Sequence, residues 1–200
     1  MVLLPKCEHG SQVVEVVERI EAILKTHKQE REIFLMPIIE SALGVENAFE
    51  IASASDSVVA MAIGLEDYTA DLGVKRTEAG GESLYARTRL VNACKAAGIQ
   101  PIDSVYSDVE NMEGLLQNVE TSRSLGFEGM GCIHPRQVPV IRQAFVPTED
   151  EIEKASRIVE AFEEAEARGA GVVALGSKMI DPPVVKRAQR TLDLAQKLKS

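Results

Sequence analysis

The sequence has few aromatic residues, few cysteines and no long apolar run, and each shortage excludes a class of protein. Aromatic residues make up 4% of the 200 residues, and tryptophan is absent. Three cysteines, an odd number, argue against a disulfide framework. No apolar stretch approaches the roughly 20 residues that span a bilayer, and the apolar start MVLLP is too short for a signal peptide. We therefore expect a cytoplasmic protein with no membrane segment.

The net charge of the chain argues against nucleic acid and anionic membranes as partners. The formal net charge is −9, which opposes binding to nucleic acid and to anionic membranes. The remaining composition, 45% hydrophobic and 26% charged, is that of an ordinary globular protein. An anionic ligand would therefore need a local cluster of basic side chains.

Apolar, strand-like segments alternate with helix-like segments along most of the chain. This alternation predicts βαβ units and a parallel sheet. Continuous apolar strands covered by helices fit either a doubly wound sheet or a (β/α)8 barrel. No G-x-G-x-x-G turn follows a strand, which argues against a dinucleotide-binding fold. The barrel has a shortage of its own. Eight units need roughly 250 residues, and only about five fit here. The expected strands are residues 2–5, 33–39, 58–64, 101–105 and 127–133.

Helices alone are expected after the last strand. Thr148 and Glu151 form a capping-box pattern at the start of a long helix. A turn-rich connector, GAGVVALGSKMID, leads to a final helix that opens at Asp181. In the barrel form, these segments would give an incomplete TIM-barrel-type catalytic domain over residues 1–146 and a helical C-terminal extension over residues 147–200.

Two acids stand at corresponding places after neighbouring strands. LMPIIE ends in Glu40, and GLEDYTAD carries Asp67, so the two lie 67 − 40 = 27 residues apart. One barrel unit has roughly 30 residues, so both acids are expected at the carboxyl end of the barrel. A pair of carboxylates there suits Mg²⁺, with water and substrate as the other ligands. The alternative is two solvated acids, one of which caps a helix.

Five longer stretches of the sequence carry a family resemblance: LMPIIESALGVENAFEIA, VVAMAIGLEDYTADLGVKRT, VNACKAAGIQPIDSVYSDV, GFEGMGCIHPRQ and GSKMIDPPVVKRA. They resemble the citrate lyase β-subunit branch of the HpcH/HpaI aldolase superfamily. The resemblance implies a (β/α)8 barrel with a helical extension. It also implies that Glu40 and Asp67 bind Mg²⁺, whereas the neighbouring Glu66 is not a ligand. Glu40 is expected to contact the substrate as well.

The resemblance also implies a reaction. Members of this branch cleave a citryl thioester on acyl carrier protein to oxaloacetate and an acetyl thioester, within a complex of citrate lyase subunits. The alternatives are a lyase that acts on malyl-CoA or citramalyl-CoA, and a truncated chain that only associates with partners. A homo-oligomer is also expected.

Asp181 is the predicted general acid for this reaction. The MIDPP stretch resembles the family motif that supplies a catalytic aspartate, which in relatives reaches the site of a neighbouring subunit. The alternative is structural, because aspartate followed by Pro182 is an ordinary helix start.

The chain departs from the family at its beginning. Family members carry three further strands first, with an arginine that grips the substrate carboxylate. The first strand here corresponds to the fourth of the family, so we expect the 200 residues alone to be inactive, to aggregate, or to need the other segment in trans.

Basic residues near the predicted metal loop are the remaining candidates. Arg76 is predicted to bind substrate, within a cluster that also holds Lys75, Arg87 and Arg89. A solvated helix face is the alternative for this cluster. Lys6, at the end of the first strand, is expected near the mouth of the barrel. Structural roles are expected for His134 and for the three cysteines, which are predicted to be buried.

Overall fold

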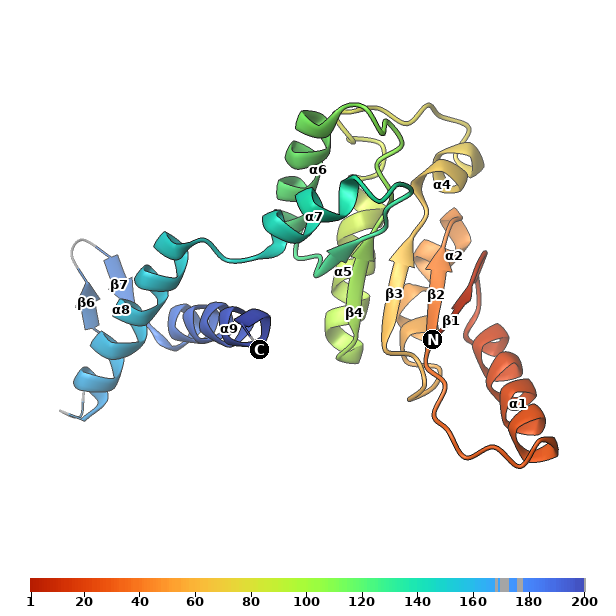
Figure 1. Ribbon diagram of the computed structural model, residues 1–200, viewed down its shortest axis with the longest axis horizontal. Coiled ribbons are helices and arrows are strands. Elements are labelled where there is room, and N and C mark those ends of the chain that lie inside the picture. Colours follow the sequence, from red (N-terminus) through yellow and green to blue (C-terminus); the bar gives the residue numbers. More distant parts are fainter. Residues whose placement is uncertain (168, 170–172, 176–177, 200) are drawn as a thin grey trace. The chain divides into compact units, whose positions relative to one another are not determined.

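The computed structural model describes residues 1–167, 169, 173–175 and 178–199 (Figure 1). The chain divides into two compact units, Met1–Ile141 and Arg142–Ser200. The first unit contains the parallel sheet, and the second contains two long helices and a short hairpin. This division by packing lies 146 − 141 = 5 residues before the boundary expected from the sequence. The assignment of the two units as catalytic domain and extension stays a prediction.

The first unit is built on a five-stranded parallel sheet, as the alternating pattern predicted. Its strands follow one another in sequence order, so β1 and β5 lie at its two edges. In register, Leu3 pairs with Met36 and Ile39 with Ile63. The described strands form an open sheet. They are β1 (Val2–Leu4), β2 (Leu35–Ile39), β3 (Ala60–Ile63), β4 (Gln100–Asp103) and β5 (Gly129–Met130).

Strand β5 is much shorter than the predicted residues 127–133. Glycine weakens a strand because it offers no side chain to pack and loses much backbone freedom. Gly129 and Gly131 flank Met130 here, and a Cβ at position 131 would lie 2.9 Å from the Cγ1 of Val105. Close packing of the chain against Val105 therefore requires glycine where a longer strand would need a side chain.

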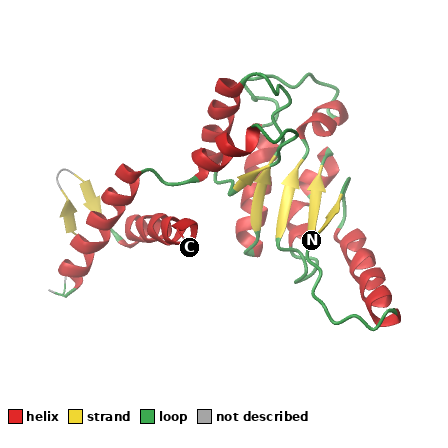
Figure 2. Cartoon of the chain, viewed as in Figure 1, coloured by secondary structure: helices red, strands yellow, loops and turns green. Residues whose placement is uncertain are grey.

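The sheet and the helices behind it enclose the apolar core. Every residue of β3 is buried, as expected for a central strand of a parallel sheet. Helix α5 packs against β3 and β4, and α3 packs against β2 and α5 (Figure 2). The largest fully buried apolar side chains include Leu35, Ile39, Ile51, Met61, Leu90 and Leu115.

Glycine residues end two helices of this unit. Gly98 and Gly126 adopt positive φ angles of 75° and 99° and end α5 and α6 as C-caps. Two short helices, α2 and α3, meet at Asn47. The helices of the first unit are α1 (Gly10–Thr26), α2 (Ala42–Glu46), α3 (Ala48–Ala52), α4 (Leu65–Asp71), α5 (Leu84–Ala97) and α6 (Met112–Leu125). Helix α7 (Gln137–Phe145) crosses the boundary between the two units at Ile141.

The second unit pairs α8 (Glu149–Glu166) with α9 (Pro182–Lys199). The predicted capping box at Thr148 is confirmed, since Glu151 N donates to Thr148 Oγ1 at 3.2 Å and Thr148 N donates to Glu151 Oε2 at 2.9 Å. The expected connector contains a hairpin of β6 (Val173–Leu175) and β7 (Lys178–Ile180), and parts of that connector lie outside the described residues. Of the helices in the described ranges, none is long and apolar enough to cross a bilayer.

Candidate metal centre and substrate pocket

Glu40 lies at the carboxyl end of β2, as predicted. Its Oε2 accepts a hydrogen bond from the backbone N–H of Lys6 at 3.0 Å. The side chain runs across Gly64, where a Cβ would lie 2.7 Å from both Cγ and Oε1 of Glu40. Glycine at position 64 therefore makes room for the carboxylate at this edge of the sheet.

Asp67 lies near the same edge but on a different element from the one expected. It stands in the first turn of α4, not at the end of β3. Both ends of this short helix are anchored: Leu65 N donates to Ser104 Oγ at 3.1 Å, and Ala42 N donates to Asp71 Oδ2 at 2.8 Å. Anchoring at both ends fixes the backbone from which Asp67 projects.

Lys6 connects the two carboxylates. Its backbone N–H reaches Glu40, and its Nζ lies 2.8 Å from Oδ1 of Asp67. The hydrogen bond to Asp67 raises the pKa of Lys6 above its ordinary value. Glu40 and Asp67 thus contact the same residue, although they are 27 positions apart in sequence (67 − 40).

The chemistry of this pair fits a divalent cation with few protein ligands. In the part of the chain that the structure describes, no group of three or more histidine, cysteine, aspartate and glutamate side chains could hold a metal ion. Mg²⁺ is commonly bound by one or two carboxylates and takes its other oxygens from water and substrate. Glu40 and Asp67 match that donor set, whereas the residues that the structure describes form no closed all-protein cage.

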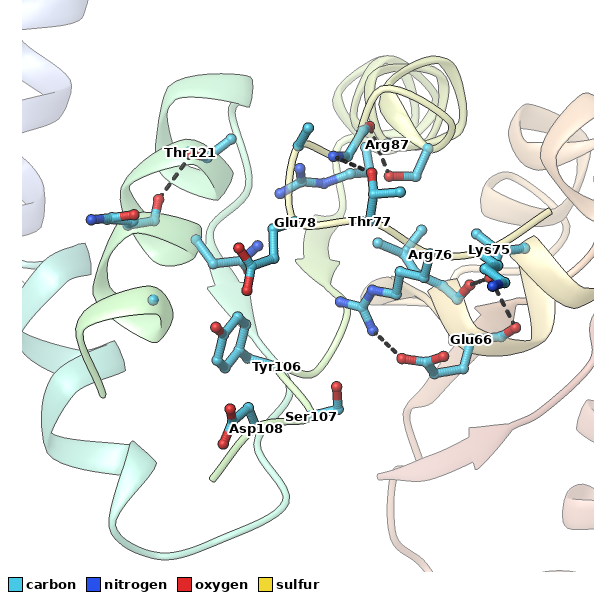
Figure 3. A pocket seen from close by; sticks show the side chains of 18 of the residues that line it. Glu66, Lys75, Arg76, Thr77, Glu78, Arg87, Tyr106, Ser107, Asp108 and Thr121 are labelled. Atoms are coloured by element: carbon cyan, nitrogen blue, oxygen red, sulfur yellow. Dashed lines mark hydrogen bonds and ion pairs between the residues drawn. The ribbon is translucent and has the colours of Figure 1, made fainter. Parts of the chain in front are cut away.

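A pocket of about 860 Å³ opens beside α4 (Figure 3). Its walls come from the segment between α4 and α5, the segment after β4, and α6. Arg76 lies on its wall and is held in place: it donates to Glu66 Oε1 at 2.8 Å and to the carbonyl of Val105 at 2.9 Å. Only 17% of the Arg76 side chain is exposed, so its guanidinium is a fixed positive group in the pocket.

The predicted basic cluster is divided by the fold. Lys75 and Arg87 also line the pocket, but Arg87 is buried in an ion pair with Asp103. Arg89 is not a lining residue, and its guanidinium donates to the carbonyl of Glu46 at 3.1 Å. The four side chains therefore do not form one anion-binding patch.

A turn on the pocket wall is held by Glu82. Its carboxylate accepts hydrogen bonds from the backbone N–H of Thr77 at 3.0 Å and from the Thr77 hydroxyl at 2.7 Å. The bond from the backbone N–H is the main cause that lowers the pKa of Glu82 below its ordinary value. On the facing wall, loss of hydration raises the pKa of Tyr106.

Asp181 forms the helix-capping contact expected from its alternative, structural role. Its Oδ1 accepts a hydrogen bond from Val184 N at 3.2 Å, so it caps α9. This cap is in the second unit, whereas Glu40, Asp67 and Arg76 are in the first. The catalytic role of Asp181 stays a prediction.

Structural roles were predicted for His134 and for the three cysteines, and the prediction that the cysteines are buried was wrong for one of them. His134 Nδ1 accepts a hydrogen bond from Arg136 N at 3.2 Å. Cys7 and Cys94 are buried, and burial raises their pKa values to about 11 and about 12. The prediction for Cys132 was wrong: this cysteine is exposed.

Sequence reasoning missed Asp103 and Tyr106. Asp103 ends β4 as an acid at the end of an apolar strand, which is the same signal that singled out Glu40. Tyr106 follows on the pocket wall, and its hydroxyl accepts a hydrogen bond from Asn111 Nδ2 at 3.1 Å. No local pattern distinguishes Tyr106 from an ordinary loop tyrosine.

Comparison with known proteins shows that the chain is similar to carbon–carbon lyases. The chain is 41% identical over 197 residues to citrate lyase subunit beta of Haemophilus influenzae, covering 98% of this chain and 68% of that relative. It is 32% identical over 205 residues to the mitochondrial citramalyl-CoA lyase of Rattus norvegicus, covering 98% and 61% respectively. The chain thus spans about two thirds, or less, of the length of these relatives.

A solved structure shares the fold. The CitE protein of Mycobacterium tuberculosis, in complex with magnesium, acetoacetate and coenzyme A, matches with a TM-score of 0.81 and 30% identity. That match covers 98% of this chain and 68% of the other. Residues 1–135 match the family described as HpcH/HpaI aldolase/citrate lyase. The chain therefore belongs to the HpcH/HpaI aldolase/citrate lyase family.

Proposed function

We propose that the protein is a Mg²⁺-dependent carbon–carbon lyase that cleaves a citryl thioester to oxaloacetate and an acetyl thioester. The observation that carries this proposal is the placement of Glu40 and Asp67 on the two sides of Lys6. Magnesium in the related CitE structure supports a metal at this position. The parallel sheet is then part of a TIM-barrel-type domain whose carboxyl edge holds the site.

Glu40 and Asp67 would hold the cation. When bound, the cation would lower the pKa of the substrate hydroxyl. The hydroxyl proton would pass to solvent water as the carbon–carbon bond breaks and a ketone forms, and the bonding electrons would go to the thioester fragment as an enolate. Asp181 delivers a proton to the enolate carbon as general acid.

Arg76 would bind the anionic part of the substrate. Its guanidinium is already fixed by Glu66 and Val105, so little side-chain freedom is lost on binding. The pocket of about 860 Å³ that it faces is large enough for an acyl thioester arm. The substrate would enter between the segment that precedes α5 and the segment that follows β4.

Two carriers of the thioester are possible, and separate observations favour each. The 41% identity to a citrate lyase subunit favours acyl carrier protein as the carrier and other citrate lyase subunits as partners. The similarity to a citramalyl-CoA lyase favours coenzyme A. The first is the proposal and the second is the alternative; for both we infer a cytoplasmic homo-oligomer.

The test is cleavage of three substrates: citryl-acyl carrier protein, citryl-CoA and citramalyl-CoA. Oxaloacetate would be followed through malate dehydrogenase and NADH, and pyruvate through lactate dehydrogenase. With the N-terminal segment that family members carry supplied in trans, we expect Mg²⁺-dependent oxaloacetate release that EDTA stops and that Asp67→Asn or Glu40→Gln lowers by about 100-fold or more. Asp56→Asn, in an exposed acid before β3, is the matched control and should retain full activity.

The outcomes separate the candidates. Faster cleavage of citramalyl-CoA than of either citryl thioester would favour the alternative. No cleavage of any thioester, by protein that is folded and binds Mg²⁺, would favour a chain that only associates with partners. Full activity in Asp67→Asn would contradict the proposed metal centre.

A further inference from the structure

Lys6 is held in a backbone conformation that lysine rarely adopts. Its φ angle is +51°, in the left-handed region that favours glycine. The surrounding chain maintains this conformation: Lys6 N donates to Glu40 Oε2 at 3.0 Å, and Cys7 N donates to the carbonyl of Ile38 at 3.1 Å. Cys7 is fully buried, so the position of the Lys6 Cα is fixed.

The fixed Cα places the ammonium group on Asp67. The distance from Nζ to Oδ1 is 2.8 Å, while 68% of the Lys6 side chain and 55% of the Asp67 side chain are exposed. Exposed ion pairs of this kind contribute little stability, because water competes for both charges. The pair is therefore weak enough for another cation to break.

We propose that Lys6 is the internal counterion of Asp67 and that a divalent cation must displace its ammonium group to bind. This inference rests on the proposed function, in which Glu40 and Asp67 are the metal ligands. The backbone and the side chain of Lys6 act on different carboxylates. The backbone N–H keeps the Glu40 carboxylate in position, whereas the ammonium group neutralises Asp67 until the cation arrives.

Electrostatic repulsion favours the displacement. A carboxylate oxygen bonded to a divalent cation has a positive charge beside it, so an ammonium group at 2.8 Å from the same oxygen would be strongly repelled. The lysine side chain is long and exposed, so it can swing away while its backbone N–H stays on Glu40. Cation binding therefore breaks one of the two contacts of Lys6 and leaves the other.

The chain contains a matched control for Lys6. Lys28, which follows α1, is the other non-glycine residue with positive φ in the described ranges, at +52°. It is exposed, and its backbone N–H donates to the carbonyl of Lys25 at 3.2 Å. Substitutions at position 28 therefore reproduce the change in backbone preference and in net charge at a place far from Glu40 and Asp67 in sequence.

The experiment is a titration of the purified protein with Mn²⁺, followed by electron paramagnetic resonance of the free ion at constant ionic strength. We expect Lys6→Met and Lys6→Gly to bind Mn²⁺ about threefold to tenfold more tightly than the unmodified protein, because the competing charge is gone. Lys6→Arg should stay within about threefold of the unmodified protein, because the positive charge is kept. Lys28→Met and Lys28→Gly should bind as the unmodified protein does.

A second readout follows the ammonium group itself. In a protein labelled with ¹⁵N-lysine, Mg²⁺ should shift the side-chain resonance of Lys6 and leave that of Lys28 in place. Lys6→Gly also tests the backbone, since glycine removes the unfavourable φ and should not lower the melting temperature by more than Lys6→Met does.

The outcomes distinguish this inference from the proposed metal centre. If Asp67→Asn does not weaken Mn²⁺ binding, the metal centre and the role of Lys6 are both wrong. If Asp67→Asn weakens binding but Lys6→Met leaves it unchanged or weaker, the metal centre stands and the counterion role is overturned. Circular dichroism of each variant shows whether the fold is retained.

Discussion

Arg87 of α5 and Asp103 at the end of β4 form a buried ion pair, with 6% and 1% of their side chains exposed. The Ser122 hydroxyl also donates to Asp103, and the Arg87 guanidinium lies 5.7 Å from the centre of the Phe127 ring. Asp103 Oδ1 accepts the backbone N–H of Ser104 at 2.8 Å. Because the Ser104 hydroxyl in turn anchors the start of α4, this pair supports the helix that carries Asp67.

Arg87→Met should therefore be strongly destabilising. Removing one partner of a buried pair leaves the other charge without compensation and costs about 3–5 kcal/mol. Arg19→Ala is the control, because the Arg19–Glu15 pair is exposed and such helical pairs are worth about 0.3–0.5 kcal/mol. The measurement is the free energy of unfolding in urea. A loss below about 1 kcal/mol in Arg87→Met would show that the pair does not hold the fold together.

Asp181→Asn separates capping from catalysis. Asparagine caps a helix about as well as aspartate, so the melting temperature should change little. Turnover should fall by about 10²–10⁴-fold, because the amide cannot donate the proton. Asp181→Ala should in addition lose about 1 kcal/mol of stability with the cap. Unchanged turnover in Asp181→Asn would leave Asp181 with the capping role alone.

The three thiols should differ in reactivity. The thiolate is the reactive form, and the raised pKa values of Cys7 and Cys94, about 11 and about 12, leave about one molecule in a thousand or fewer ionised at pH 8. Exposed Cys132 should react first with an aromatic disulfide reagent, and three equivalents should react only after unfolding. Cys132→Ser should abolish the fast phase. Two fast equivalents in the native protein would contradict the described burial.

The turn held by Glu82 should loosen in acid. Its pKa is lowered in the folded protein, so the carboxylate contributes stability above its unfolded pKa, and that contribution is lost as the pH falls through the folded pKa. Protection of the Thr77 amide against hydrogen exchange should therefore be lost only below the pH range in which an ordinary glutamate carboxyl titrates. Glu82→Ala should show low protection already at pH 7, whereas Glu78→Ala, at an exposed acid nearby, should not. Equal protection in Glu82→Ala and the unmodified protein would refute this contact.

Local sequence patterns predicted the elements whose cause is local. The five apolar strands and their parallel arrangement follow from the alternation of apolar and helix-like segments along the chain. The capping box of Thr148 and Glu151 is of the same kind. Glu40 was identified because an acid that ends a buried strand is conspicuous in the sequence.

The rest depends on packing between distant segments or on local preferences that packing overrides. Helix α4 was missed because it begins directly after Gly64, with no loop residues to mark its start, and Asp67 therefore lies one turn beyond the strand. The pairing of Arg87 with Asp103 joins a helix to a strand across 16 positions. The left-handed backbone of Lys6 opposes the preference of lysine, so only the surrounding fold could reveal it.

The most direct test of the proposed metal centre is the position of a bound ion. Crystals of the protein soaked in Mn²⁺ would be measured by anomalous diffraction, because Mn²⁺ is a close substitute for Mg²⁺ at oxygen ligands. The account predicts an anomalous peak bonded to one carboxylate oxygen of Glu40 and one of Asp67, with the Lys6 ammonium group moved off Asp67. A peak bonded to other residues, or no peak at these two carboxylates at saturating Mn²⁺, would contradict it.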